Sequence, residues 1–137
     1  MSWKRLSAAV VDLDQLESNV KSFDYAKEQA VAALKRGEDV LWVTATHDEA
    51  VKVFNSMLNT LDSAEVWEQE IRFKYKTATF RVMCVENVYF FGSFENVKLY
   101  VFNAQVVDRA FGKDYSETFY KTHEWRDAPV IVYHPSQ

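Results

Sequence analysis

The sequence predicts a single α/β domain of three-layer type, with helices on the faces of a mixed, mainly parallel β-sheet. Three observations carry this prediction. Residues 40–43 form a continuous apolar run, which is typical of a strand buried on both faces. An amphipathic helical pattern follows over residues 46–61, and residues 71–85 alternate like a β-hairpin. The order of helix, strand, helix, hairpin, strand, helix and strand indicates a layered α/β fold.

The length and composition indicate one domain with a substantial core. A chain of 137 residues is long enough for one core and short for two, so we expect a single domain over residues 1–137. Residues 1–22 are an ambiguous N-terminal segment, and residues 134–137 form a tail. Hydrophobic residues make up 48% of the chain and aromatic residues 15%, which excludes a disordered protein. The formal net charge of −4 disfavours non-specific binding to polyanions.

Cysteine usage and the N-terminus predict a cytoplasmic protein with no membrane partner. Cys84 is the only cysteine, so no internal disulfide or Cys-based zinc site can form and a reducing compartment is expected. It lies in an apolar run, which favours a buried structural thiol. Asp12 and Asp14 make the N-terminal stretch too polar for a signal peptide or a membrane span.

The first 36 residues contain one ambiguous segment and one clear helix. A helical stripe through residues 6–16, favoured from Asp12 onward, competes with a short strand over residues 8–11. The clear helix is predicted over Tyr25–Arg36, which is rich in strong helix formers. Asp24 is expected to be its N-cap, and Gly37 to take the left-handed position that ends it.

A capping box is predicted at the start of the next helix. Thr46 and Glu49 have the spacing at which the Thr46 hydroxyl accepts from the Glu49 amide while the Glu49 carboxylate accepts from the Thr46 amide. The apolar face of this helix is predicted to consist of Ala50, Val53, Phe54, Met57, Leu58 and Leu61.

The second half of the chain is predicted to be mostly strand. Apolar residues at 71, 73 and 75 alternate with basic residues, and residues 79–85 return as a second strand after a tight connection at 77–78. Further strands are predicted at 87–91, 97–102 and 130–133. Asn103 is expected to cap a helix that ends at Gly112, and Asp114 to cap a second helical piece.

The stretch from Ala30 to Thr46 resembles the core of P-loop ATPases of the helicase and viral terminase type. In those families an Ala-rich helix ends in a glycine and leads into a strand that finishes in a threonine-containing loop. The hairpin at 71–83 and the strands at 89–93 and 99–104 follow the order expected before and at a Walker B position. The resemblance covers residues 25 to 110, and it implies the fold of a P-loop ATPase.

Two departures from this family pattern predict that its chemistry is lost. No Gly-x-x-x-x-Gly-Lys-Ser/Thr motif occurs, so the chain offers no loop of backbone amides and lysine to hold a triphosphate. Asn103 and Ala104 stand where that family carries paired acidic residues, so that position offers no carboxylate to magnesium or to an attacking water. We therefore expect no cofactor and no ATP hydrolysis, and a degenerate core that serves as a binding surface.

Candidate catalytic and metal-binding residues are few. His47 and Asp48 follow a predicted strand, at the edge where α/β folds place ligands, and are candidates for an acid and a base. No catalytic residue is assigned beyond these two, because the capping box already accounts for Glu49. A C-terminal cluster has metal-capable side chains at a spacing that matches no recurrent ligand pattern, so no metal site is predicted. Its members are His123, Glu124, Asp127 and His134.

The candidate binding residues are a basic row on the hairpin and an aromatic group after it. The basic row either contacts phosphates or an acidic partner, or is a solvated face whose cations prevent edge pairing. Three consecutive aromatic residues at 89–91 require that both faces of their strand are covered, or that one ring lies at an interface. The candidates are Arg72, Lys74, Lys76, Arg81, Phe90 and Phe94.

These observations favour a non-enzymatic interaction or regulatory protein of viral or microbial origin, which binds a protein of nucleic-acid metabolism. Two alternatives stay open: a nucleic-acid-binding accessory protein that uses the basic hairpin, and a hydrolase that uses His47 and Asp48. The aromatic content also predicts a homodimer. The aromatic residues expected in its interface are Trp3, Phe90, Phe94 and Trp125.

Overall fold

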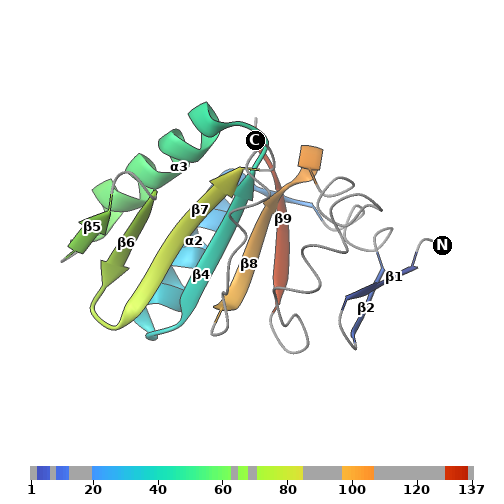
Figure 1. The fold of residues 1–137 in the computed structure, drawn as a ribbon, viewed down its shortest axis with the longest axis horizontal. Helices are drawn as coiled ribbons and strands as arrows, with labels where there is room; N and C mark the ends of the chain where they lie inside the picture. Colours follow the sequence, from blue (N-terminus) through green and yellow to red (C-terminus); the bar gives the residue numbers. More distant parts are fainter. Residues whose placement is uncertain are drawn as a thin grey trace.

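The structure, a computed structural model, describes residues 3–6, 9–12, 20–62, 65–67, 71–84, 97–106 and 129–135. Within these residues the fold is a seven-stranded, mostly parallel sheet with two α-helices, which confirms the predicted α/β class (Figure 1). The strand order is β3-β9-β8-β4-β7-β6-β5. The elements of this layer are β3 (Lys21–Ser22), α2 (Phe23–Lys35), β4 (Asp39–Thr44), α3 (His47–Thr60), β5 (Glu65–Trp67), β6 (Arg72–Tyr75), β7 (Ala78–Cys84), β8 (Val97–Asn103), the 3-10 turn η3 (Ala104–Val106) and β9 (Val130–His134).

Near the N-terminus the structure has strands, which was one of the two predicted alternatives. β1 (Trp3–Leu6) and β2 (Ala9–Asp12) form a separate two-stranded antiparallel sheet. The alternative of a helical stripe through Leu6 and Val10 does not hold, because the two residues lie on paired strands. The rest of the helix expected after Asp12 lies outside the described residues.

Helix α2 begins two residues earlier than its sequence predicts. Its N-cap is Ser22, whose hydroxyl accepts from the Tyr25 amide at 3.1 Å, so Asp24 lies in the first turn and is not the cap. An acidic side chain in the first turn still interacts favourably with the helix dipole. The predicted end is confirmed, since Gly37 has φ +83° directly after the C-cap Arg36.

Strand β4 is the central strand of the sheet. It pairs in parallel with β7 on one side and with β8 on the other, and residues 40–44 are buried. The continuous apolar run therefore predicted the most enclosed strand correctly.

Helix α3 has the predicted N-cap, but the second hydrogen bond of the predicted capping box is replaced by another. Thr46 is the N-cap, and its hydroxyl accepts from the Glu49 amide at 3.2 Å. The Glu49 carboxylate accepts from the amide of Ala45, at 3.2 Å, and not from that of Thr46 as predicted. The difference arises because the carboxylate also meets side chains from two other strands, which are described below. The predicted apolar face is buried at Ala50, Val53, Phe54, Met57 and Leu61, and Leu58 packs against it.

The hairpin is formed by β6 and β7, which pair antiparallel. Its connection is Lys76-Thr77, one residue before the expected position, and Ala78 already belongs to β7. Lys76 has φ +54° in this turn. The short edge strand β5 pairs with β6 and was not expected as a separate element.

Strands β8 and β9 confirm the last two predicted strands. Asn103 caps a short 3-10 turn, since its side-chain oxygen accepts from the Gln105 amide at 2.8 Å. The continuation of that helix to Gly112, the strand at 87–91 and the helical piece from Asp114 lie outside the described residues.

Both described helices cover the same face of the sheet, where the main core forms (Figure 1). Trp42 lies at its centre, fully buried, with the rings of Phe23, Phe80 and Tyr133 between 5.1 and 6.2 Å away. Neither of the two described helices is long and apolar enough to cross a membrane.

Candidate functional site

The candidate site lies at the carboxyl ends of the parallel strands, beside β4 and β8. From β4 the chain reaches β7 on one side, and it later returns to β8 on the other side of β4. Such a switch in strand order opens a crevice at the carboxyl ends of the strands, which is the usual place for ligands in α/β folds. Glu49, in the first turn after β4, and Asn103, the last residue of β8, meet at this point.

The Glu49 carboxylate is the centre of a hydrogen-bond network between four elements. The Asn103 amide nitrogen donates to Oε1 at 2.7 Å and to Oε2 at 2.9 Å. The Tyr133 hydroxyl, from β9, donates to Oε1 at 2.7 Å, and the Ala45 amide donates to Oε2 at 3.2 Å. Three protein donors therefore approach the carboxylate, and the Asn103 nitrogen is shared between its two oxygens.

The network continues into the core through Tyr133. The indole Nε1 of Trp42 donates to the Tyr133 hydroxyl at 2.9 Å, so this hydroxyl accepts one hydrogen bond and donates another. Burial raises the pKa of Tyr133 above its ordinary value of 10.0, and the adjacent Glu49 carboxylate raises it further against the opposing effect of the Trp42 donor. Tyr133 therefore stays neutral and keeps its proton on the bond to Glu49.

This arrangement suits a structural role of Glu49 better than a chemical one. A general base must accept a proton from a substrate or water, but the lone pairs of this carboxylate already accept from protein donors. A magnesium ion does not fit here either. The Asn103 side chain turns its NH2 group to Glu49, and its oxygen accepts from the Gln105 amide.

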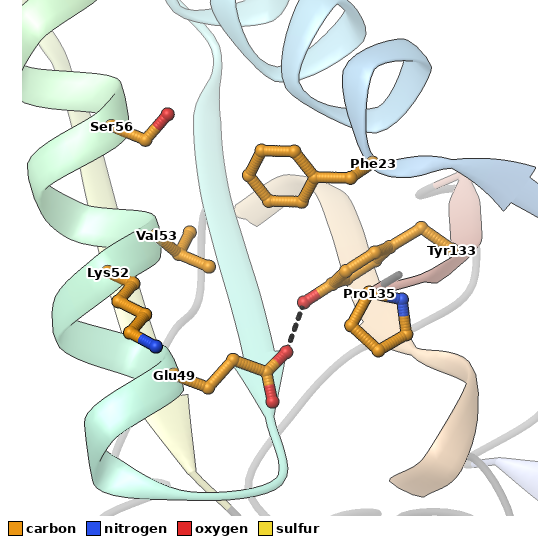
Figure 2. A pocket seen from close by; sticks show the side chains of 7 residues that line it. All are labelled: Phe23, Glu49, Lys52, Val53, Ser56, Tyr133 and Pro135. Carbon is orange, nitrogen blue, oxygen red and sulfur yellow. Dashed lines mark hydrogen bonds between the residues drawn. The ribbon is translucent and has the colours of Figure 1, made fainter. Parts of the chain in front are cut away.

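A pocket of about 280 Å³ adjoins the network on the helix-covered side of the sheet (Figure 2). The Glu49 and Tyr133 side chains meet at one end of it, and their hydrogen bond forms part of its wall. The remaining wall comes from the start of α2, from one face of α3 and from the end of β9. The lining residues are Phe23, Glu49, Lys52, Val53, Ser56, Tyr133 and Pro135.

The residues proposed for catalysis and metal binding are not brought together within the described part of the chain. His47 and Asp48 are exposed in the first turn of α3, and neither takes part in the Glu49 network. His134 is exposed at the end of β9, while His123, Glu124 and Asp127 lie outside the described residues. Among the residues that are described, no group of three or more His, Cys, Asp and Glu side chains forms a metal site. Cys84 is buried, as predicted.

The basic residues of the hairpin lie mostly on one face of the sheet. Arg72 stands opposite Arg81 in the β6–β7 register, and Lys74 follows on the same face, opposite to buried Phe73. Lys76 occupies the turn, outside the predicted row. The Arg72 guanidinium lies over the Trp67 ring, 4.4 Å from its centroid. Phe90 and Phe94, the other binding candidates, lie outside the described residues, as do the side chains of Trp3 and Trp125.

Sequence reasoning missed the network because each member had a sufficient local explanation. Glu49 was assigned to a capping box and Asn103 to a helix cap, and both roles are real in part. One signal in the sequence points to the contact: Asn103 directly follows one predicted strand, and Glu49 lies in the first turn of the helix that follows another. Parallel strands bring their carboxyl ends to one edge of the sheet.

Comparison with solved structures finds a neighbour with a similar fold. It is the large terminase ATPase domain of Thermus phage P74-26, in a mutant form, with a TM-score of 0.60 and 13% sequence identity. At this identity the likeness concerns the fold alone: the fold of this chain is similar to that of the terminase ATPase domain. It covers 82% of this chain, which spans 54% of the terminase chain. No protein-family model and no curated protein matches the sequence.

Proposed function

We propose that this chain is a non-enzymatic interaction domain, a P-loop ATPase-like core without ATPase chemistry that binds a protein of nucleic-acid metabolism. The observation that carries the proposal is the state of the Glu49 carboxylate. It lies at the edge where α/β folds usually hold their ligands, yet three protein donors already donate to it. Asn103 supports the same conclusion, because an amide at the end of β8 serves to hold Glu49 in place.

The proposed partner follows from the similarity in fold to a terminase ATPase domain. A terminase ATPase domain belongs to a phage protein, so a viral or microbial origin and a partner that acts on nucleic acid are the extensions we propose for this chain. A homodimer is compatible with this function and is tested separately below.

Calorimetric titration with Mg-ATP tests the non-enzymatic part of the proposal. We expect no binding heat up to millimolar nucleotide, because the chain lacks the phosphate-binding motif and because Glu49, the carboxylate described where β4 and β8 end, already accepts from Asn103 and Tyr133. Millimolar or tighter binding that is lost in Glu49→Gln, while the variant stays folded, contradicts the proposal. Affinity purification with the full chain, followed by mass spectrometry, then names the partner.

A second candidate function is binding of single-stranded nucleic acid by the hairpin. The stack of Arg72 on the exposed Trp67 ring favours it, since aromatic rings that stack bases beside cations that contact phosphates are typical of such surfaces. Lys74 and Arg81 extend the positive charge on the same face.

Fluorescence anisotropy with a labelled oligonucleotide at low salt tests this candidate. Charge reversal of Arg72, Lys74 and Lys76 to Glu should weaken binding strongly, and the wild-type affinity should fall steeply with salt. Reversal of Lys27, Lys35 and Lys98 makes the same change in net charge elsewhere and is the matched control. No binding by the wild-type protein in low salt, or equal losses in both triple variants, rejects the hairpin as a nucleic-acid site.

A further inference from the structure

The pocket beside Glu49 has the size and the walls of a site for one aromatic ring. Its volume of about 280 Å³ exceeds the roughly 150 Å³ that is known to hold a benzene molecule, and it is just below the range of about 300–1,000 Å³ for drug-sized ligands. Most of its wall is apolar, from Phe23, Val53, Tyr133 and Pro135. Phe23 and Tyr133 already pack edge to face, 5.6 Å apart, so a third ring can extend this aromatic group.

The polar groups of the pocket divide into two that are occupied and two that are available. Glu49 and the Tyr133 hydroxyl are held in the network. Within the described part of the chain, neither the Ser56 hydroxyl nor the Lys52 ammonium makes a hydrogen bond or an ion pair. Ser56 and Lys52 lie one helical turn apart on α3 and both line the pocket (Figure 2). A ligand can therefore be oriented by one hydroxyl and one cation.

The Ser56 hydroxyl and the Lys52 ammonium favour an aromatic ligand that carries an N–H donor. The lysine ammonium is attracted to the face of an aromatic ring, most strongly to that of tryptophan. The serine hydroxyl can accept from an indole N–H. The negative charge of Glu49 at the end of the pocket disfavours a ligand carboxylate beside it, and its oxygens already accept from protein donors.

We propose that this pocket binds an aromatic side chain of a protein partner, tryptophan in preference to phenylalanine. The inference rests on the proposed function, because it identifies the anchor through which a protein would engage this domain. Interfaces commonly depend on one or two such anchors, with tryptophan and tyrosine enriched among them. A tryptophan from the partner would lie between α3 and the end of β9, with its indole N–H on Ser56 and its ring against Lys52 and Phe23.

The probes for this site are N-acetyl-tryptophanamide, N-acetyl-phenylalaninamide and N-acetyl-leucinamide, titrated into the full chain. Binding is followed by the NMR shifts of the Val53 methyl groups, which line the pocket. We expect saturable binding of the tryptophan amide with a Kd on the order of 1 mM, as suits a single isolated ring. The phenylalanine amide should bind about three- to tenfold more weakly, and the leucine amide more weakly still.

Two variants of Ser56, with Asn59→Phe as a control, test whether the tryptophan amide binds in this pocket. Ser56→Phe fills the pocket and should weaken the tryptophan amide by at least about tenfold. Asn59→Phe adds the same ring on the exposed side of α3 and should leave binding unchanged. Ser56→Ala removes only a hydroxyl that makes no hydrogen bond within the described residues, so we expect the fold to be kept. It should weaken the tryptophan amide by about three- to fivefold while leaving the phenylalanine amide unaffected.

The inference is overturned if no tryptophan amide binds up to 10 mM, if the leucine amide binds as well, or if indole-3-acetate binds more tightly than the neutral amide. It is also overturned if Ser56→Ala weakens both aromatic amides alike. None of these outcomes contradicts the proposed function, which is contradicted instead by Mg-ATP binding that is lost in Glu49→Gln. Binding of the tryptophan amide and absence of Mg-ATP binding are thus measured independently.

Discussion

Replacing Tyr133 with phenylalanine removes one oxygen from the network and leaves the ring in place. The buried Trp42 Nε1–H loses its acceptor, which costs about 1–3 kcal/mol. Glu49 loses one of its donors, and hydrogen bonds to a charged group contribute about 1.5–3 kcal/mol each. Because water in the adjoining pocket can replace part of the second contact, we expect the free energy of unfolding to fall by about 2–4 kcal/mol.

Equilibrium unfolding in urea, followed by circular dichroism, measures this change. With an m-value of about 2 kcal/mol per molar urea, the midpoint should fall by roughly 1–2 M. Tyr25→Phe is the matched control, since Tyr25 is exposed and its substitution should change stability by less than about 0.5 kcal/mol. If Tyr133→Phe costs no more than Tyr25→Phe, the Trp42–Tyr133–Glu49 connection does not stabilise the fold and the reasoning is wrong.

Three further predictions concern pH, the cap of α3 and assembly. The pKa of Tyr133 is raised on folding, so its contribution to stability is present below pH 10 and is lost as the pH rises above that value. The difference in unfolding free energy between the wild type and Tyr133→Phe should be constant from pH 7 to 9 and shrink by about 1.4 kcal/mol per pH unit above 10; a difference that persists to pH 11.5 contradicts this. Thr46→Ala should cost about 1 kcal/mol in urea unfolding through loss of the N-cap, against less than about 0.5 kcal/mol for the exposed Thr60→Ala, and equal costs would count against the cap. Light scattering at micromolar concentration should show a dimer, and a 16.0 kDa monomer would refute it.

The parts of the fold that depend on local patterns were predictable from the sequence. The apolar run at 40–43 predicts the central strand because a strand covered on both faces has no polar alternation. The spacing of Thr46 and Glu49 predicts where α3 begins, and Gly37 predicts where α2 ends, since a positive φ favours glycine.

The remaining features depend on contacts between distant residues, which local patterns do not encode. Ser22 and Asp24 are both good N-caps, and the choice between them depends on where β3 pairs with β9. The Glu49 carboxylate leaves the predicted capping box for Asn103 and Tyr133, which lie 54 and 84 residues away in the chain. Residue spacing predicts an acceptor at that position, but only the strand order shows which donors reach it.

Phosphate release from Mg-ATP by the wild-type protein and by Glu49→Gln decides whether this carboxylate has a structural role alone. We expect no release above the buffer rate from either protein, together with a lower urea midpoint for Glu49→Gln, because its amide would face the donors of Asn103 and Ala45. Phosphate release by the wild-type protein that Glu49→Gln reduces by about a hundredfold or more, with its urea midpoint unchanged, would show that Glu49 acts in catalysis and that the domain is an enzyme.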